Sequence, residues 1–169
     1  MVEKGYDHIT VQQVLDRAKV GRATFYAHFR DKEALFCSTI DNLRSGLVRR
    51  WDELLSSAGK GRGELDFALG FFQHVSESRD IYHAVVCSDA GPIVDRQFRR
   101  MFADLARADL SATQTCTALQ MEATVQFVVG SLMYLMTWWM DYEVKLSAEE
   151  INEVFLRATL PGVRSLQGG

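Results

Sequence analysis

The sequence predicts an all-α protein in which a small N-terminal pair of helices precedes a larger helical body. Only two prolines occur in 169 residues, so few positions interrupt a helix. Apolar residues recur every three or four positions in most segments, which is the period of one helix face. No segment of note alternates apolar and polar residues as a half-buried strand would. We expect two domains, residues 1–45 and residues 46–169.

The first domain centres on residues 10–32, TVQQVLDRAKVGRATFYAHFRDK, which predict two short helices joined by a tight turn at residues 19–21. Thr10 is expected to cap the first helix. The apolar residues of that helix share one face: Val11, Val14, Leu15 and Ala18. In the second helix Phe25 and Phe29 lie four residues apart, so we expect them on its inner face with Val20 below them.

The second short helix leaves an unusual set of side chains to face outward. They are Arg22, Ala23, Thr24, Tyr26, Ala27 and His28. Arginine can read the O6 and N7 atoms of guanine, and Thr, Tyr and His can bond phosphates. Residues 1–50 carry nine Lys/Arg and six Asp/Glu, whereas residues 51–169 carry ten and sixteen. A basic end on an acidic body favours a nucleic-acid contact by that end; the alternative is a plain helical hairpin with scattered charges and an incidental tyrosine.

The body is predicted to be a series of helices with recognisable ends. Asp31 is expected to cap a long helix with apolar residues at Ile40, Leu43, Leu47, Trp51 and Leu54. The loop SSAGKGRG at residues 56–63 ends it. Further helices are expected at residues 64–77, 80–87, 93–110 and 116–143. The last helix should begin at the capping box of Ser147 and Glu150 and end near residue 159, before Pro161.

Composition limits the compartment and the class of chemistry. The three cysteines are widely spaced and form no C-x-x-C pair, which indicates a reducing compartment. The most apolar run, residues 127–140, is shorter than the ~20 residues that span a bilayer. No G-x-S-x-G, P-loop or H-E-x-x-H motif occurs. We therefore expect a cytoplasmic protein with no membrane contact, no enzymatic activity, no cofactor and no metal site.

Aromatic and methionine residues cluster in the body at helical spacing. Such residues usually form plain core, but with a few polar groups they also suit an apolar pocket. The candidate residues for a small apolar or aromatic ligand are Phe71, His74, Tyr82, His83, Phe98, Phe102, Gln126, Tyr134, Thr137 and Trp138. His74 and His83 have no third metal-binding residue at ligand spacing, so structural hydrogen bonds are expected for them.

The run GYDHITVQQVLDRAKVGRATFYAHFRDKEALF, residues 5–36, resembles the DNA-binding signature of the TetR/AcrR family of bacterial repressors. The resemblance implies a homodimer with an N-terminal helix-turn-helix and a C-terminal domain for ligand binding and dimerisation. It implies that Thr10 caps a helix and bonds a phosphate. It implies that Arg22, Ala23 and Ala27 read bases. It places Thr24, Tyr26, His28 and Lys32 at positions that contact the DNA backbone, with Thr24 also able to reach a base.

Two apolar stripes near the C-terminus have two readings, a seam within one subunit or a dimer interface. The stripes are Val125, Val128, Leu132, Leu135 and Trp139, followed by Ile151, Val154 and Phe155. The family resemblance implies the second reading, in which two helices from each subunit form a four-helix interface. A dimer also fits the DNA, because two recognition helices about 34 Å apart can read a palindrome.

The sequence departs from the family pattern at two places. In the turn, Lys19 stands where the family has a glycine that tolerates positive φ, and Gly21 replaces a serine cap. Before Gly5, only a few residues stand where the family has a full first helix. The main hypothesis is a ligand-responsive regulator, a repressor that binds a palindromic operator as a homodimer and is released by an apolar or aromatic effector. The alternative is a dimeric ligand-binding or interaction protein that does not bind DNA.

Overall fold

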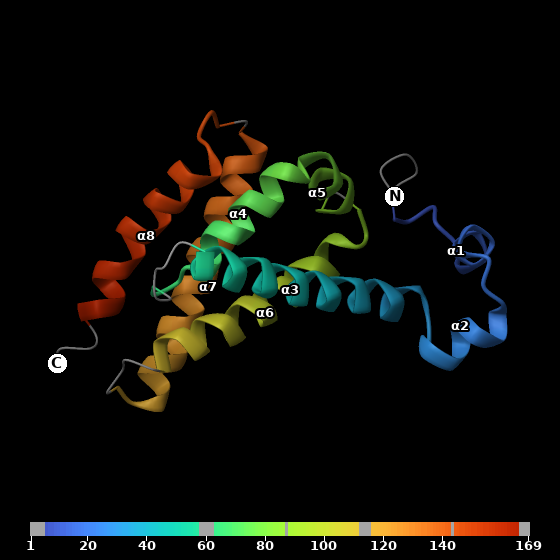
Figure 1. Ribbon diagram of the computed structural model, residues 1–169, viewed down its shortest axis with the longest axis horizontal. Helices are drawn as coiled ribbons and strands as arrows, with labels where there is room; N and C mark the ends of the chain where they lie inside the picture. The colour runs from blue at the N-terminus through green and yellow to red at the C-terminus, as the bar shows by residue number, and fades with distance from the viewer. Residues whose placement is uncertain (1–5, 58–62, 87, 112–115, 143, 166–169) are drawn as a thin grey trace. The chain divides into compact units, whose positions relative to one another are not determined.

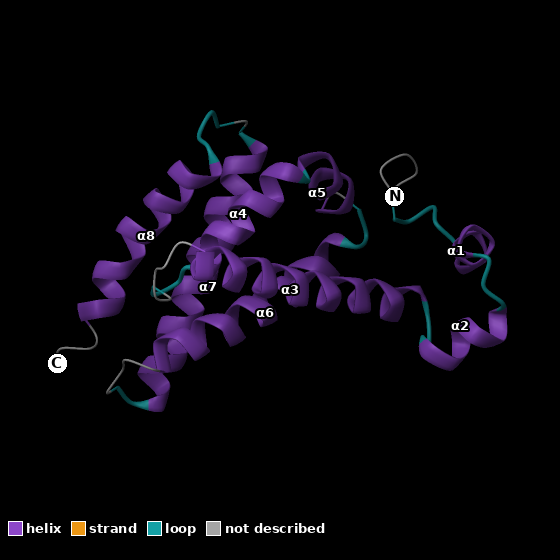
Figure 2. Ribbon diagram, viewed as in Figure 1, coloured by secondary structure: helices purple, strands orange, loops and turns teal. Residues whose placement is uncertain are grey.

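The computed structural model describes residues 6–57, 63–86, 88–111, 116–142 and 144–165, and within these ranges it contains helices and no strand (Figures 1 and 2). The helices are α1 (Val11–Ala18), α2 (Arg22–His28), α3 (Lys32–Ser57), α4 (Phe67–Glu77), α5 (Arg79–Val86), α6 (Gly91–Ser111), α7 (Ala118–Asp141) and α8 (Ala148–Ser165). The all-α prediction is confirmed. Residues 58–62 of the expected loop, and residue 87 at the expected end of the fifth helix, lie outside the described residues.

The chain divides into two compact units. Unit 1 contains Met1–Gly46 and Ser78–Gln97, and unit 2 contains Leu47–Glu77 and Phe98–Gly169. The division at Gly46 falls beside the expected boundary, but nothing in the sequence pattern indicated that Ser78–Gln97 belongs with the N-terminal unit. Helices α3 and α6 each contribute residues to both units.

Helix α3 begins as predicted, because the Asp31 side chain accepts a hydrogen bond from the backbone N–H of Ala34 at 2.7 Å. Ile40 is buried on its inner face, with 7% of its surface exposed. The side chains of Leu43, Leu47, Trp51 and Leu54, which the sequence analysis placed on the same face, lie outside the described residues.

The core of unit 2 is built from aromatic rings on four helices. Phe71 and Phe72 of α4 are fully buried, as are Phe102 of α6 and Trp139 of α7. The Phe71 and Phe102 rings meet edge to face at 4.5 Å, and Phe72 meets Trp139 in the same way at 5.8 Å. The Trp139 indole N–H donates to the Leu146 carbonyl at 3.0 Å, so its polar atom is satisfied inside the core. Helix α8 packs against α4 and α7.

The apolar stripe of α7 faces this core, which corrects the expected dimer interface. Val125, Val128, Leu132 and Trp139 are 0–1% exposed within one chain, as are Ile151 and Phe155 of α8. Leu135 is half-buried, and only Val154 is well exposed, at 47%. The periodicity of these residues is the same for a stripe that packs inside a subunit and for one that packs between subunits, so periodicity could not separate the two readings.

The opposite face of α7 carries large exposed side chains. Phe127, Tyr134 and Trp138 are 58%, 77% and 37% exposed. Spacings of seven and four residues place the three on one side of the helix. The exposed aromatic face, as we call these three residues, therefore lies away from the buried stripe. Within the described residues no helix is both long and apolar enough to cross a membrane.

Helix α8 begins as predicted and ends later than predicted. The Ser147 hydroxyl accepts from the Glu150 N–H at 3.1 Å, and the Glu150 carboxylate accepts from the Ser147 N–H at 2.8 Å. The helix then continues through Pro161 to Ser165. Proline removes one backbone hydrogen bond there. However, only 1% of the Val163 surface is exposed, and Arg164 pairs with Glu64 at 2.9 Å, so tertiary contacts hold the last turn.

Candidate nucleic-acid interface

Helix α1 is fixed at both ends by local contacts. The Thr10 hydroxyl accepts from the Gln13 N–H at 3.2 Å, and the Gln13 side chain accepts from the Thr10 N–H at 3.0 Å. This capping box confirms Thr10 as the predicted cap. At the other end Lys19 adopts φ 54° and ψ 41°, the left-handed conformation that favours glycine. Lys19 therefore adopts the left-handed conformation at the position where the family has a glycine that tolerates it.

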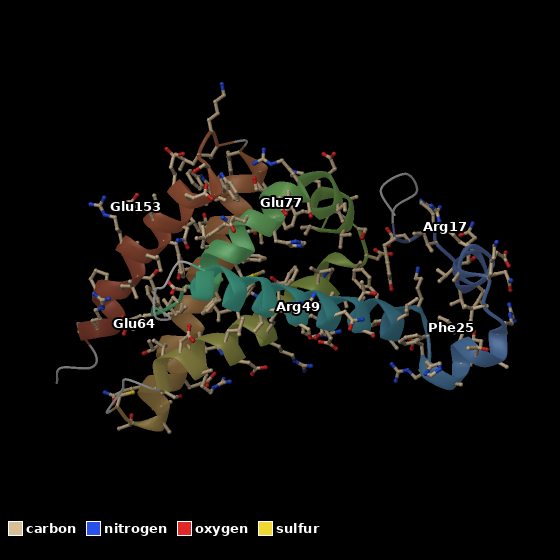
Figure 3. The ribbon with its side chains drawn as sticks, in the orientation of Figure 1. Arg17, Phe25, Arg49, Glu64, Glu77 and Glu153 are labelled. Carbon is tan, nitrogen blue, oxygen red and sulfur yellow. The ribbon has the colours of Figure 1, made fainter. Side chains whose placement is uncertain are left out.

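Helix α2 is held by one buried ring. Gly21 precedes it without a side-chain cap, and Phe25 is buried with 6% of its surface exposed (Figure 3). Phe25 contacts the rings of Tyr26 at 5.2 Å and Phe29 at 5.6 Å. Val20, expected beneath these rings, is instead 39% exposed. Phe25 is thus the main anchor of a helix of only seven residues.

The outward face of α2 is the one the sequence predicted. All six candidate residues on it are exposed, and Tyr26 is 54% exposed: they are Arg22, Ala23, Thr24, Tyr26, Ala27 and His28. Two alanines on this face leave room for close approach, while an arginine, a threonine, a tyrosine and a histidine supply donors and acceptors. A surface of this kind can enter a groove and bond to base edges and phosphates.

Arg22 is held by a chain of side-chain hydrogen bonds from α1. Its Nε donates to the Gln12 side-chain oxygen at 3.2 Å, and the Gln12 amide nitrogen donates to Asp16 at 2.8 Å. Because Nε is engaged, the two terminal amino groups of the guanidinium are the ones that can meet a base. Gln12 and Asp16 were not among the predicted site residues, although their spacing of four residues on α1 was a usable signal.

Lys32 does not point its ammonium away from unit 1. Its Nζ donates to the backbone carbonyls of Tyr6 and Ile9, both at 3.0 Å, and lies 4.0 Å from the centre of the Tyr6 ring. Burial, and then the nearby Glu33 carboxylate, raise the pKa of Tyr6. The family resemblance implies that Lys32 contacts the DNA backbone, whereas in this structure it has partners within its own unit.

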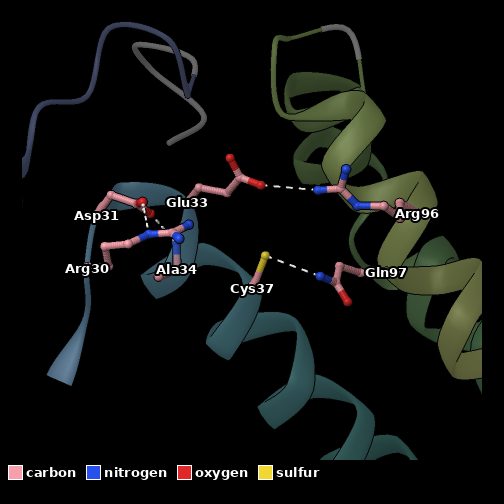
Figure 4. Close-up of polar contacts among 7 residues, drawn as sticks. All are labelled: Arg30, Asp31, Glu33, Ala34, Cys37, Arg96 and Gln97. Carbon is pink, nitrogen blue, oxygen red and sulfur yellow. Dashed lines mark hydrogen bonds and ion pairs between the residues drawn. The ribbon is translucent and has the colours of Figure 1, made fainter.

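The start of α3 is joined to the start of α6 inside unit 1 (Figure 4). Arg96 pairs with Glu33 at 3.1 Å, and the Gln97 amide donates to the Cys37 thiol at 3.3 Å. The backbone N–H of Ala34 and the Arg30 guanidinium lower the pKa of Asp31. Because their partners lie about 60 residues away, no local pattern could have indicated Arg96 or Gln97 as part of this unit.

The ten residues predicted to bind a ligand are divided between the two units and differ in burial. Phe71, Phe98 and Phe102 form one ring cluster in unit 2. Tyr82 and His83 lie on α5 in unit 1, and His74 is half-buried on α4 in unit 2. Gln126, Tyr134 and Trp138 are exposed on α7, and the Thr137 hydroxyl donates to the Met133 carbonyl in its own helix. Exposed aromatics were assigned to a pocket because composition does not reveal which way a helix faces.

In the part of the chain that the structure describes, no group of three or more His, Cys, Asp or Glu residues could hold a metal ion.

Comparison with known proteins agrees with this geometry. Residues 1–38 match the family model described as "Bacterial regulatory proteins, tetR family", and residues 65–159 match the model "Transcriptional regulator C-terminal region". The HTH-type transcriptional repressor KstR2 of Mycolicibacterium smegmatis is 21% identical over 180 residues, which cover 98% of this chain and 86% of the relative. The HTH-type transcriptional regulator YdgC of Bacillus subtilis is 23% identical over 165 residues, and the match covers 88% of this chain and 82% of the relative.

Two solved structures share the fold. The dihydroxyacetone kinase operon activator DhaS superposes with a TM-score of 0.67 at 15% identity, covering 99% of this chain and 91% of that one. A TetR transcriptional regulator from Streptococcus agalactiae has the same TM-score at 24% identity, and the superposition covers 94% of this chain and 85% of that one. The family matches, the helix-turn-helix geometry and the all-helical body lead to one conclusion. The chain belongs to the TetR family of transcriptional regulators, which are non-enzymatic DNA-binding proteins.

Proposed function

We propose that this regulator is a repressor that binds a palindromic operator as a homodimer and is released by a small apolar or aromatic effector. The observation that supports DNA reading best is the outward face of α2, on which all six candidate residues are exposed while Phe25 anchors the helix from behind. Repression is the role named for the KstR2 relative, and we extend it to this chain.

In this proposal Arg22, Ala23 and Ala27 face base edges, and Thr24, Tyr26 and His28 contact the DNA backbone, with Thr24 also within reach of a base. Thr10 contacts a phosphate while it caps α1. Arg22 supplies the strongest sequence preference, because its free amino groups suit the O6 and N7 acceptors of guanine. The phosphate contacts set the position of the helix but carry little sequence information.

The homodimer is proposed to form through α7 and α8. The support is the exposed aromatic face of α7 together with the exposed Val154 of α8, since exposed aromatic side chains of this size are typical of protein interfaces. The expected helix pair is retained, but the contact residues change from the buried stripes to the exposed face. Each subunit would then offer one α2 to one half of a palindrome.

The effector is proposed to act on the aromatic cluster of Phe71, Phe98 and Phe102. These rings contact one another at 4.5–6.0 Å, so a ligand between them would gain mainly dispersion and ring contacts. Two of the rings lie on α6, and the same helix carries Arg96 and Gln97, which bond to Glu33 and Cys37 of α3. A shift of α6 on ligand binding would therefore act on the contacts at the start of α3.

The first experiment measures binding of the protein to the DNA upstream of its own gene, with random duplex of equal length as competitor. We expect selective binding and a protected palindrome. Arg22→Ala should lose roughly 1–3 kcal/mol of operator affinity and relax the preference at one base pair. Binding no tighter than to random duplex would contradict the proposal. A reporter gene under that promoter then separates repression, in which deletion of the regulator raises expression, from activation.

The second experiment tests the effector. Apolar and aromatic compounds are screened for a rise in the melting temperature, since a ligand that binds only the folded state stabilises it. A compound that both raises the melting temperature and releases operator DNA is an effector. We expect Phe102→Ala to lower its affinity and Ile81→Ala, which changes an exposed residue on α5, to leave it unchanged. Equal affinity in wild type and Phe102→Ala would place the effector elsewhere.

A further inference from the structure

We propose that Asp7 is a positioning residue of the DNA-binding unit, whose carboxylate couples the junction between α5 and α6 directly to the turn before α1. This link is separate from the bonds of Arg96 and Gln97 to α3, through which the proposed effector response passes. The inference rests on the proposed operator binding and deepens it, because it identifies a second route by which a movement of α6 reaches the recognition helix.

The contact joins two segments that lie 82 positions apart in the chain. The Asp7 carboxylate accepts a hydrogen bond from the backbone N–H of Asp89 at 3.1 Å. Both residues belong to unit 1, and the donor lies two residues before Gly91, the first residue of α6. The amino end of a helix carries a positive partial charge, so a carboxylate is favoured at this place.

The donor is fixed by the junction on which it lies. The hydroxyl of Ser88, the residue before Asp89, donates to the Val85 carbonyl of α5 at 2.7 Å. The Gly91 N–H of α6 donates to the Ser88 carbonyl at 2.8 Å. The two helices approach so closely that a Cβ at residue 91 would lie 2.3 Å from the Val86 carbonyl oxygen. A displacement of either helix therefore carries the Asp89 N–H with it.

The acceptor is fixed to the start of α1. Asp7 lies in a turn that is closed by a hydrogen bond from the Ile9 N–H to the Tyr6 carbonyl at 3.1 Å. Thr10, the cap of α1, follows this turn directly. Helix α1 in turn holds the Nε of Arg22 by a side-chain hydrogen bond. A displacement of Asp7 thus reaches the residue proposed to read guanine through one turn and one helix of eight residues.

The strength of the contact suits a link that must open. Asp7 and Asp89 are both exposed, so water competes for the bond, and one such bond changes an equilibrium only about fivefold. When it opens, the turn keeps a second contact, because the Tyr6 ring packs on Phe36 of α3 at 5.0 Å. Loss of the Asp89 bond therefore releases the turn toward α6 while its contact with α3 remains.

The test uses full-length protein and compares two substitutions at Asp7. Asp7→Ala removes the acceptor, whereas Asp7→Asn keeps an oxygen there and has the same charge as Asp7→Ala, so the pair separates the hydrogen bond from the charge. Each is combined with Gly91→Ala, which displaces the junction. Ser88→Ala, which removes the hydroxyl from the junction, replaces Gly91→Ala if that variant does not fold.

Two quantities are measured at a temperature where circular dichroism shows every protein folded. One is affinity for the operator duplex, and the other, without DNA, is amide hydrogen exchange of Asp89 and residues 7–10. We expect Asp7→Ala to bind the operator about fivefold more weakly than Asp7→Asn. Gly91→Ala should weaken binding about fivefold in wild type and in Asp7→Asn, but by less than about twofold in Asp7→Ala. The Asp89 amide should exchange faster in Asp7→Ala than in Asp7→Asn.

A residue that only supports the local fold has a different signature. Gly91→Ala would then weaken operator binding equally in Asp7→Asn and Asp7→Ala, and this result overturns the inference, as does equal operator affinity of these two variants. If wild type itself binds no operator, the proposed function fails, but hydrogen exchange still decides the coupling. Gly91→Ala should speed exchange at residues 7–10 in Asp7→Asn and not in Asp7→Ala. Equal acceleration in both would show that the junction does not act through Asp7.

Discussion

Several side chains of the DNA-binding unit are already bonded to one another before any DNA is present. Asp16 holds Gln12, and Gln12 holds the Nε of Arg22. An arginine that is oriented in this way gives up less side-chain entropy on binding than a free one. It also presents the end of the guanidinium, whose paired amino groups match the two acceptors on guanine. The selectivity of Arg22 should therefore depend on a residue that does not itself touch the base.

Gln12→Ala tests this dependence. We expect it to weaken operator binding less than Arg22→Ala, and to reduce discrimination at the base pair that Arg22 is proposed to read, because the guanidinium becomes free to turn. The measurement is affinity for the operator and for the same operator with that base pair exchanged. In an Arg22→Ala background, Gln12→Ala should have no further effect. An equal loss in both backgrounds would show that Gln12 acts on its own.

The cap of α3 predicts a dependence of stability on pH. The Ala34 N–H, and then Arg30, lower the pKa of Asp31. A lowered pKa in the folded state stabilises the protein above the ordinary pKa of about 4, and the benefit is lost as pH falls through the lowered value. Asp31→Asn keeps an oxygen to cap the helix and removes the charge, whereas Asp31→Ala removes both.

The expected order of melting temperatures at neutral pH is wild type, Asp31→Asn, Asp31→Ala. The gap between wild type and Asp31→Asn should narrow as pH falls below 4, while the gap between Asp31→Asn and Asp31→Ala should persist. Thermal unfolding at a series of pH values measures both. A gap between wild type and Asp31→Asn that stays constant down to the lowest pH would show that the charge of Asp31 does not contribute.

Among the helical elements, α5 and α6 approach each other closely at a glycine. The N–H of Gly91, at the start of α6, donates to the Ser88 carbonyl at 2.8 Å. A Cβ at residue 91 would lie 2.3 Å from the carbonyl oxygen of Val86, at the end of α5. Only glycine allows the two helices to come this close. Helix α6 also holds Arg96 and Gln97, which bond to α3. The geometry of the junction therefore affects these contacts within unit 1.

Gly91→Ala should destabilise the protein by roughly 1–3 kcal/mol, because a backbone oxygen must move to admit the methyl group. Gly70 in α4 is the matched control, since a Cβ there meets nothing within 4 Å. Gly70→Ala should stabilise by about 0.5–1 kcal/mol through its helix propensity. Chemical unfolding of both variants gives the comparison. Equal stability of Gly91→Ala and wild type would mean that the junction opens without cost.

The helices could be predicted from the sequence because their signals are local. Thr10, Asp31 and Ser147 act as caps through neighbours three residues away, and three- and four-residue spacing gave the helix faces. What a face packs against is not local. The buried stripe with Val128 and the exposed face with Tyr134 both recur at helical spacing on α7, and only the tertiary structure separates them. The contact of Lys32 with Tyr6 likewise joins residues 26 positions apart.

For the whole molecule, the two faces of α7 predict different outcomes for substitutions on the same helix. Tyr134 is 77% exposed, so its replacement should not disturb the fold. Val128 is fully buried, so a charge there should unfold the subunit itself. If the exposed aromatic face pairs with a second copy, replacing Tyr134 would break the dimer and leave a folded subunit, whereas a charge at Val128 would unfold the subunit.

We therefore predict that wild type sediments as a dimer at micromolar concentration and that Tyr134→Glu sediments as a folded monomer. An aromatic residue at the centre of an interface typically contributes about 2 kcal/mol or more, which is roughly a 30-fold change in the dimer dissociation constant. Ile81→Glu is the control, because it places the same charge on another exposed apolar residue, on α5. It should remain a dimer. Analytical ultracentrifugation with circular dichroism on the same samples measures association and folding together.

The monomeric variant should also bind a full palindrome no more tightly than a single half-site, since only a dimer can engage both halves at once. A Tyr134→Glu protein that remains dimeric would show that the subunits pair through another surface.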